Sequence, residues 1–182
     1  AEEQVKLGVE AEQVKFRSVN SFLLNDVDNI RIDMRQHRGH FGTLVPFLFA
    51  CNAQPQPPKP QGAPATLPKV AIEKITCNVN LQDLGLCRLP VRKNGSVVNW
   101  AAPIVKEWKI TEEAGYSALR AFLAQGGGLS KYEADRHLAD GSAVARISPY
   151  LRFGMLSCRT VYWEASAENA KEVATTFWRR LV

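Results

Sequence analysis

The spacing of hydrophobic positions predicts helices through most of the second half of the chain. After Thr111, apolar residues recur every three or four positions, as on one face of a helix, until the glycines at 126–128. Thr111 can cap the helix start, and the two glutamates after it suit the positive end of the helix dipole. The expected buried face consists of Ala114, Ala118, Leu119, Ala121, Phe122 and Leu123.

Three further helices are predicted toward the end of the chain. Ser148 followed by Pro149 predicts a helix start with the serine as its cap, and Gly154 ends this helix within about two turns. Ser157 can cap the next run, 158–165. The last helix is expected over 167–182, with a buried side of Ala170, Val173, Ala174, Phe177 and Leu181.

The first fifty residues mix helix and strand patterns. Glu2–Leu7 favours a helix that Gly8 can end, and alternating apolar and polar residues at 14–17 are typical of a half-buried strand. Residues 25–29 break this pattern, and a polar, turn-rich stretch separates them from the apolar run 44–50. We therefore expect one helix and one strand in succession at the start.

Proline and glycine mark the connections. Six of the ten prolines fall between residues 53 and 68, where neither a helix nor a central strand can be sustained. This segment is expected to run extended over the surface as a polyproline-like connector, and it is the expected domain boundary. Gly85 is expected to end one helical turn at 81–86, and Asn94 with Gly95 predicts a turn.

The charge and hydrophobic content of the chain limit the kinds of partner that the sequence indicates. Lys and Arg number 23 against 18 Asp and Glu, a net charge of +5, which permits nucleic-acid contact without indicating it because no dense basic block occurs. No run approaches the roughly eighteen apolar residues of a membrane span.

His37 and His40 form an HxxH without a third ligand in view, so no metal is assigned. The cysteines lack CxxC pairs and zinc-type spacing, which favours reduced thiols in an intracellular protein: Cys51, Cys77, Cys87 and Cys158.

A candidate anion site precedes the helix at Ser148. The loop 140–147 leads into a helix N-terminus, where N–H groups and the positive dipole end favour an anion, with Arg146 and Arg152 nearby in sequence. From these features alone, the pattern is typical of an ordinary helical hairpin, since most capped helix starts bind nothing.

Three motifs, in order, change this interpretation. Y-x-x-x-R at 132–136, followed by R-I-S-P-Y-L-R-F-G-x-L-S-x-R at 146–159, resembles the opening of the flavin-binding domain of the cryptochrome/photolyase family. W-x-I-T-E-E-A at 108–114 resembles the family's W-x-P-G-E-x-x-A, and 177–182 resembles the start of its F-x-x-E-L-x-W-R helix. Residues 41–47 are similar to a segment near the end of the family's α/β antenna domain.

The resemblance implies a mostly helical, multi-domain fragment. In these terms, residues 1–50 are the C-terminal part of the α/β antenna domain, 51–70 are a Pro-rich linker, and 71–182 begin an all-α FAD-binding domain. Both ends of the chain look cut, so earlier strands, much of the flavin pocket and the electron-transfer tryptophans are expected outside it. That relay is therefore not assigned to the tryptophans present: Trp100, Trp108, Trp163 and Trp178.

The resemblance also implies which residues contact FAD. Tyr132 matches a tyrosine that reaches the flavin phosphates, and Arg136 matches an arginine on the salt-bridging or substrate side, a candidate DNA contact. The family's T-S-x-L-S is replaced by Val144, Ala145, Arg146, Ile147 and Ser148. Two hydroxyls are lost, which weakens the site by about 1–3 kcal/mol if those bonds were charge-assisted. Backbone N–H groups and Ser148 remain, so FAD is still expected.

Phe177 and Arg180 belong to the last motif. By register, Arg180 stands where photolyases carry a glutamate that contacts the flavin adenine and the damaged base. Arginine cannot accept either hydrogen bond, which favours a photoreceptor over a repair enzyme. We expect an FAD-binding blue-light flavoprotein of cryptochrome type that uses photoinduced electron transfer. The alternatives are a light-driven DNA photolyase for pyrimidine dimers and a relative without flavin.

The remaining expectations also follow from the resemblance. A folate or deazaflavin antenna would belong to residues before this chain, and the implied partners are DNA or signalling proteins, without a membrane. An intracellular location is expected, but nucleus, chloroplast and cytoplasm are not distinguished. No catalytic residue and no oligomeric state are assigned.

Overall fold

The computed structural model describes residues 22–31, 42–66 and 88–182, short stretches at 3–4, 7–8, 79–80 and 82–86, and the single positions 16, 33 and 35. The predicted helix at Glu2–Leu7 and the predicted strand at 14–17 fall largely outside these residues. His37, His40, Cys77 and Cys87 lie outside them as well.

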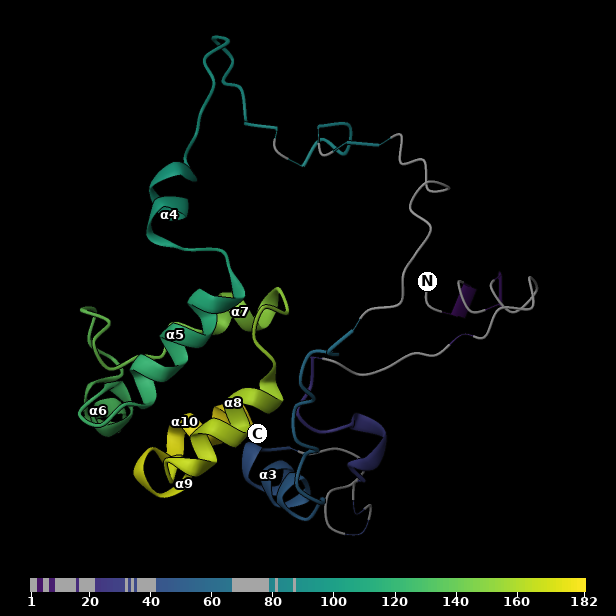
Figure 1. The fold of residues 1–182 in the computed structure, drawn as a ribbon, viewed down its shortest axis with the longest axis vertical. Helices are drawn as coiled ribbons and strands as arrows, with labels where there is room; N and C mark the ends of the chain where they lie inside the picture. The colour runs from purple at the N-terminus through teal and green to yellow at the C-terminus, as the bar shows by residue number, and fades with distance from the viewer. Residues whose placement is uncertain are drawn as a thin grey trace. The chain divides into compact units, whose positions relative to one another are not determined.

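Helices make up the regular structure of the described residues (Figure 1). The one β-type pairing among these residues is an isolated antiparallel bridge between Val91 and Val97. The chain is therefore mostly helical, as predicted, while the α/β character of residues 1–50 stays a prediction. The elements are η1 (Val27–Asn29), α3 (Leu44–Asn52), α4 (Ala102–Glu107), α5 (Glu112–Leu123), α6 (Gly128–Asp135), α7 (Ser148–Arg152), α8 (Cys158–Ala167), α9 (Ala170–Val173) and α10 (Thr175–Leu181).

The chain divides into two compact units. The smaller, Gln61–Ile110, contains α4 and the turn at Asn94 and Gly95, where Gly95 has φ +81° and donates its N–H to the carbonyl of Arg92 at 2.9 Å. This turn was predicted. The larger unit joins Ala1–Pro60 to Thr111–Val182 and holds all the candidate site residues. The predicted domain boundaries at residues 50 and 70 stay a prediction.

The core of the larger unit lies among α5, α6, α8, α9 and α10. Helix α5 packs on α6 and α8, and α10 packs on α6 and α9. Leu119, Leu156 and Val161 are its fully buried large side chains among the described residues. Burying each such side chain contributes roughly 1.5–3 kcal/mol, so this packing fixes how the helices sit against one another.

Two of the predicted helix caps are confirmed and one is wrong. Thr111 accepts a hydrogen bond from the N–H of Ala114 at 3.2 Å, and Ser157 accepts one from the N–H of Arg159 at 3.2 Å. Ser148, by contrast, is the first residue of α7 and not its cap. The buried Ile147 takes the cap position in a helical conformation and accepts the first backbone bond, from Leu151 at 3.1 Å. The helix therefore starts one residue earlier than predicted.

The predicted single helix over 167–182 is wrong as well. It is two helices, α9 and α10, separated at Ala174, whose φ and ψ are −138° and 70°. In a continuous helix the N–H of Thr176 would bond to the carbonyl four residues earlier, but here it donates to the side chain of Glu133. Val173, predicted on the buried side, is 47% exposed as a result.

One residue of the predicted buried face of α5 is also misplaced. Ala121 is exposed, whereas the backbone of Gly115, which the pattern did not include, is buried. A Cβ added to Gly115 would lie 3.0 Å from the Tyr150 ring, so the missing side chain allows α7 to approach α5 closely. The buried face is therefore rotated toward Gly115, Leu119, Phe122 and Leu123.

The Pro-rich segment lies against α8. Its described residues, 53–66, contain no helix or strand, as predicted. Pro57 is buried, and its carbonyl accepts a hydrogen bond from Nε1 of Trp163 at 3.1 Å. The ammonium of Lys59 lies 5.2 Å from the centre of the same indole ring, within the range of a cation–π interaction. Trp163 therefore contacts the Pro-rich segment through both the Nε1 edge and the face of its indole ring.

Replacing Trp163 by phenylalanine is expected to loosen the Pro-rich segment, because the ring stays while the hydrogen bond to Pro57 is lost. One such bond contributes about 1 kcal/mol. The free energy of unfolding measured by urea denaturation should fall by at least about 1 kcal/mol. The matched control is Trp100→Phe, since Trp100 is 64% exposed and lies in the smaller unit. An unchanged free energy of unfolding in W163F would contradict this anchoring role.

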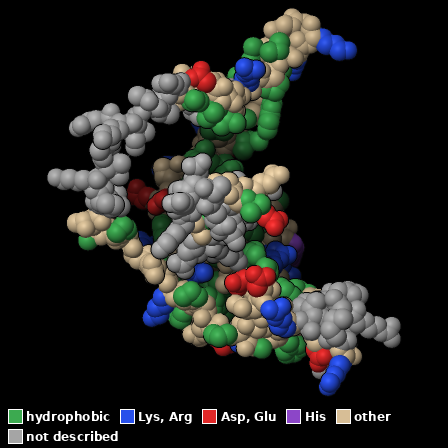
Figure 2. All heavy atoms as spheres, turned by 90° about the vertical axis from the view of Figure 1, so that its right-hand side faces the viewer, with side chains coloured by type: hydrophobic (Ala, Val, Ile, Leu, Met, Phe, Trp, Pro, Cys, Tyr) green, Lys and Arg blue, Asp and Glu red, His purple; other side chains and the backbone are tan. Residues whose placement is uncertain are grey.

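Charged groups are dispersed over the face that Figure 2 shows, where Lys and Arg side chains stand apart and do not gather into one patch. This agrees with the absence of a dense basic block in the sequence. Within the described part of the chain, no helix is long and apolar enough to cross a bilayer, and no three His, Cys, Asp or Glu side chains cluster as metal ligands would.

Candidate functional site

An aromatic cluster holds Tyr132 between two helices. Tyr132 on α6 is buried, and its ring lies nearly perpendicular to that of Phe177 on α10, with centroids 5.6 Å apart. Phe122 on α5 contacts both rings, at 5.9 Å from Tyr132 and 5.0 Å from Phe177. Edge-to-face contacts of this kind are worth about 0.5–1.5 kcal/mol beyond the buried area. The cluster therefore gives the hydroxyl of Tyr132 a fixed position.

Arg180 reaches that hydroxyl from α10. Its Nη1 donates a hydrogen bond to the Tyr132 oxygen at 3.2 Å. A guanidinium has five N–H donors, so this contact leaves others to bind an anion. The structure thus brings together three of the residues singled out in the sequence: Tyr132, Phe177 and Arg180.

The loop between α6 and α7 carries Val144, Ala145, Arg146 and Ile147, and Ser148 follows as the first residue of α7. Its start is ordered by Asp140, whose Oδ1 accepts hydrogen bonds from the N–H and the hydroxyl of Ser142, both at 3.0 Å. These bonds hold the pKa of the Asp140 carboxyl below its ordinary range. Gly141 has φ +73° and Arg146 has φ +50°, so the backbone turns sharply at two points. Strained non-glycine residues of this kind occur often at binding sites.

Side chains of the loop alternate between inside and outside. Ile147 is buried, Val144 and Ala145 are half-buried, and Arg146 and Ser148 are exposed. Among the described residues, none accepts a hydrogen bond from the N–H of Ala145 or Ser148. The loop can therefore offer backbone donors and the Ser148 hydroxyl to an anion. Helix α7 has only five residues, so its dipole adds less than the sequence suggested.

Arg136, which directly follows α6, pairs with Glu133 on that helix. Its Nη1 lies 3.3 Å from Oε2 of Glu133 and also donates to the Glu133 carbonyl oxygen. Both side chains remain about one-third exposed, and the DNA contact through Arg136 stays a prediction. A DNA contact would require the Arg136 guanidinium to leave the Glu133 carboxylate and bind a DNA phosphate instead.

Glu133 is the residue that the sequence analysis missed. Its carboxylate accepts hydrogen bonds from the N–H of Thr176 and, at 2.8 Å, from the Thr176 hydroxyl. The two residues are 43 positions apart, and no local pattern marks an acid on one helix as the cap of another. These bonds, first of all the one from the Thr176 N–H, hold the pKa of Glu133 below its ordinary value of 4.5.

The Glu133 cap makes stability depend on pH. Because the native pKa lies below 4.5, the stabilisation is complete above that value and is lost as the pH falls through the lowered pKa. The free energy of unfolding of the wild type should exceed that of Glu133→Gln at neutral pH, and the two should converge as the pH falls through the lowered pKa of Glu133. Urea titrations at a series of pH values measure this. A difference independent of pH would contradict the assignment.

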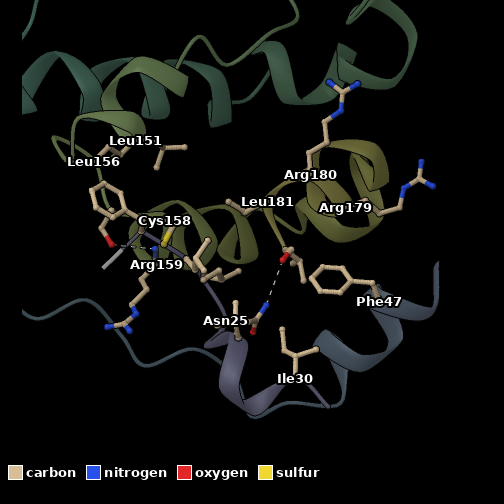
Figure 3. A pocket seen from close by; sticks show the side chains of 17 residues that line it. Asn25, Ile30, Phe47, Leu151, Leu156, Cys158, Arg159, Arg179, Arg180 and Leu181 are labelled. Carbon is tan, nitrogen blue, oxygen red and sulfur yellow. Dashed lines mark hydrogen bonds between the residues drawn. The ribbon is translucent and has the colours of Figure 1, made fainter. Parts of the chain in front are cut away.

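A further cleft is found among the described residues. It has a volume of 810 Å³ and lies between residues 22–30, the turn after α7 and the end of α10. Figure 3 shows the amide of Asn25 donating to the backbone carbonyl of Val182, at 3.5 Å, and Arg180 extending away from Asn25 and Ile30. Among the predicted site residues only Arg180 lines this cleft. Burial raises the pKa of the Cys158 thiol in its wall, which keeps that sulfur protonated.

Part of the chain is similar in sequence to known proteins. No family model matches the chain. Two curated relatives, deoxyribodipyrimidine photo-lyases from two strains of Thermus thermophilus, are each 42% identical to it over 72 residues. The match covers 37% of this chain and 17% of each relative, so the chain spans a small part of their length.

A solved structure shares the fold. The crystal structure of a bacterial class III photolyase from Agrobacterium tumefaciens matches with a TM-score of 0.66 and 22% sequence identity. The match covers 98% of this chain and 35% of that protein. The order and packing of the described helices are therefore shared with a segment of a longer protein.

Proposed function

From the membership of this chain in the cryptochrome/photolyase family, we propose that it forms part of the FAD site of a blue-light flavoprotein. The observation that carries the proposal is the contact between Arg180 and the Tyr132 hydroxyl. It places a cation and a hydroxyl donor side by side on a rigid aromatic base, which suits an anionic phosphate. Bound FAD would supply light absorption and electron transfer, and the chain would supply position and charge.

The donor groups that the chain offers are of the kinds that would suit the phosphates of FAD. Arg180 and Tyr132 offer charged and neutral donors from α10 and α6, and the loop offers the Ser148 hydroxyl and the N–H groups of Ala145 and Ser148. Phosphate groups are bound in proteins by such combinations of arginine, hydroxyl and backbone donors. Phe177 would act by holding Tyr132 in place, while Val144 and Ile147 would shape the loop.

A photoreceptor function is favoured by Arg180. In the register of the family motif, this residue replaces a glutamate that accepts hydrogen bonds from adenine and from a damaged base. A guanidinium only donates, so a dimer flipped into the site would meet a donor where it needs an acceptor. A receptor that performs no net chemistry on DNA does not need this acceptor.

DNA repair is the second candidate, favoured by the relatives. The matching curated proteins and the matching structure are photolyases by name. A light-driven photolyase takes the dimer out of the duplex before electron transfer. In that case Arg136 would turn from Glu133 toward a DNA phosphate.

The experiment that separates the two uses the native-length gene product after its FAD content has been confirmed. An oligonucleotide with a thymine dimer is illuminated with blue light in the presence of the protein. Absence of repair by the flavin-loaded protein supports the photoreceptor. Light-dependent restoration of the thymines would establish the photolyase and show that Arg180 does not prevent repair.

The 182-residue chain by itself is expected to hold FAD poorly, because it matches only 35% of the solved photolyase. Equilibrium dialysis of the purified chain against FAD should give a dissociation constant at least about tenfold weaker than that of the native-length product. A stoichiometric flavin spectrum from the isolated chain would contradict this.

A further inference from the structure

Helices α6 and α10 are joined at two points one helical turn apart. On α6 the neighbouring residues Tyr132 and Glu133 make the two contacts. On α10, Thr176 bonds to Glu133 and Arg180 bonds to Tyr132. Four residues of an α-helix advance about 6 Å, so these contacts fix both the position of α10 along its axis and its rotation.

Helix α10 depends on this attachment. It has seven residues, and a helix of this length is marginal in water without tertiary contacts. No side chain within its own segment caps it, since Ala174 occupies the cap position. The carboxylate of Glu133 takes over that role, and the hydroxyl of Thr175 lies 3.5 Å from Oε1, the oxygen that accepts the Thr176 N–H.

Two arginines lie near the negative charge of Glu133. Arg136 pairs with the carboxylate from α6, and Nη2 of Arg179 donates to the Thr176 hydroxyl at 3.2 Å from α10. An acid this close to a candidate phosphate site would otherwise repel the ligand. Because its oxygens are occupied by donors from α6 and α10, Glu133 serves to orient groups and not to bind the anion.

We propose that Glu133 is a positioning residue of the candidate cofactor site: by capping α10 at Thr176, it sets the helix so that Arg180 reaches the Tyr132 hydroxyl. This inference rests on the proposed function, since it concerns the same site. Glu133 is an acidic side chain that cannot itself bind a phosphate. In this inference it nevertheless controls the affinity of the site for a phosphate.

The test is a double-mutant cycle in the native-length protein with Glu133→Ala, Arg180→Met and the double variant. The dissociation constant of FAD is measured by titrating the apoprotein, and the thermal midpoint of the apoprotein is measured in parallel. E133A should weaken FAD binding about tenfold in the wild-type background and by less than about twofold when Arg180 is already methionine. Glu133→Gln, which keeps one acceptor oxygen, should restore part of the affinity.

The control is Asp135→Asn on the same helix, which removes one negative charge from a side chain that makes no hydrogen bond with any described residue. It should leave the FAD affinity unchanged. An equal loss in E133A whether or not Arg180 is present would overturn the inference, because a general loss of stability does not depend on Arg180. If the wild-type protein bound no FAD, the proposed function would fail. The same double-mutant cycle, measured on the thermal midpoint of the apoprotein, would still show whether Glu133 and Arg180 are coupled.

Discussion

Replacing Phe177 by alanine is expected to destabilise the helical unit by about 3–5 kcal/mol. Phe177 is 7% exposed and contacts both Phe122 and Tyr132, so its removal leaves a cavity at the junction of α5, α6 and α10. The loss also frees the Tyr132 ring, and FAD affinity should fall with it. Urea denaturation of the native-length protein, followed by tryptophan fluorescence, measures the change.

Phe153→Ala is the matched control for this substitution. The same atoms are removed, but Phe153 is 74% exposed, and such a change usually shifts stability by less than about 0.5 kcal/mol. Similar effects of F177A and F153A would mean that the aromatic cluster is not the core of this unit.

The second large effect is expected from Arg180→Glu. If the arginine prevents dimer repair by offering donors where an acceptor is needed, the variant should repair a thymine dimer about ten to a hundred times faster than the wild type. This range corresponds to one hydrogen bond to a charged group, roughly 1.5–3 kcal/mol. Rates are compared per bound flavin, because the variant loses the contact with the Tyr132 hydroxyl and places a carboxylate at the proposed phosphate site, and both changes weaken FAD binding.

Arg179→Glu controls for the change in charge. Arg179 is the preceding residue on α10, it is exposed, and its guanidinium donates a hydrogen bond to the Thr176 hydroxyl at 3.2 Å. Repair that rises equally in both variants would reflect electrostatics in general. Repair that is already fast in the wild type would remove the argument for a photoreceptor.

Local signals in the sequence were sufficient for features decided by neighbouring residues. The caps Thr111 and Ser157 and the turn at Asn94 and Gly95 depend on side chains within three positions of the backbone they serve. Motif spacing was also sufficient to find Tyr132, Phe177 and Arg180, which the structure brings together. The roles given to these residues remain predictions.

Features decided by distant residues could not be predicted. The break at Ala174 depends on Glu133, which competes with the helix for the N–H of Thr176 from 43 positions away. The docking of the Pro-rich segment depends on Trp163, 106 positions after Pro57. The periodicity of 167–182 was compatible with one helix, whereas the structure has two, and both pack on α6.

The central claim, that this chain forms part of an FAD site, is tested most directly by the flavin content of the native-length product. The protein is purified, its absorption spectrum is recorded, and the cofactor is released by denaturation and identified. We expect noncovalently bound FAD in stoichiometric amount, or its uptake from solution by the apoprotein. A folded protein that contains no flavin and takes up none would contradict the claim and favour a relative that has lost the cofactor.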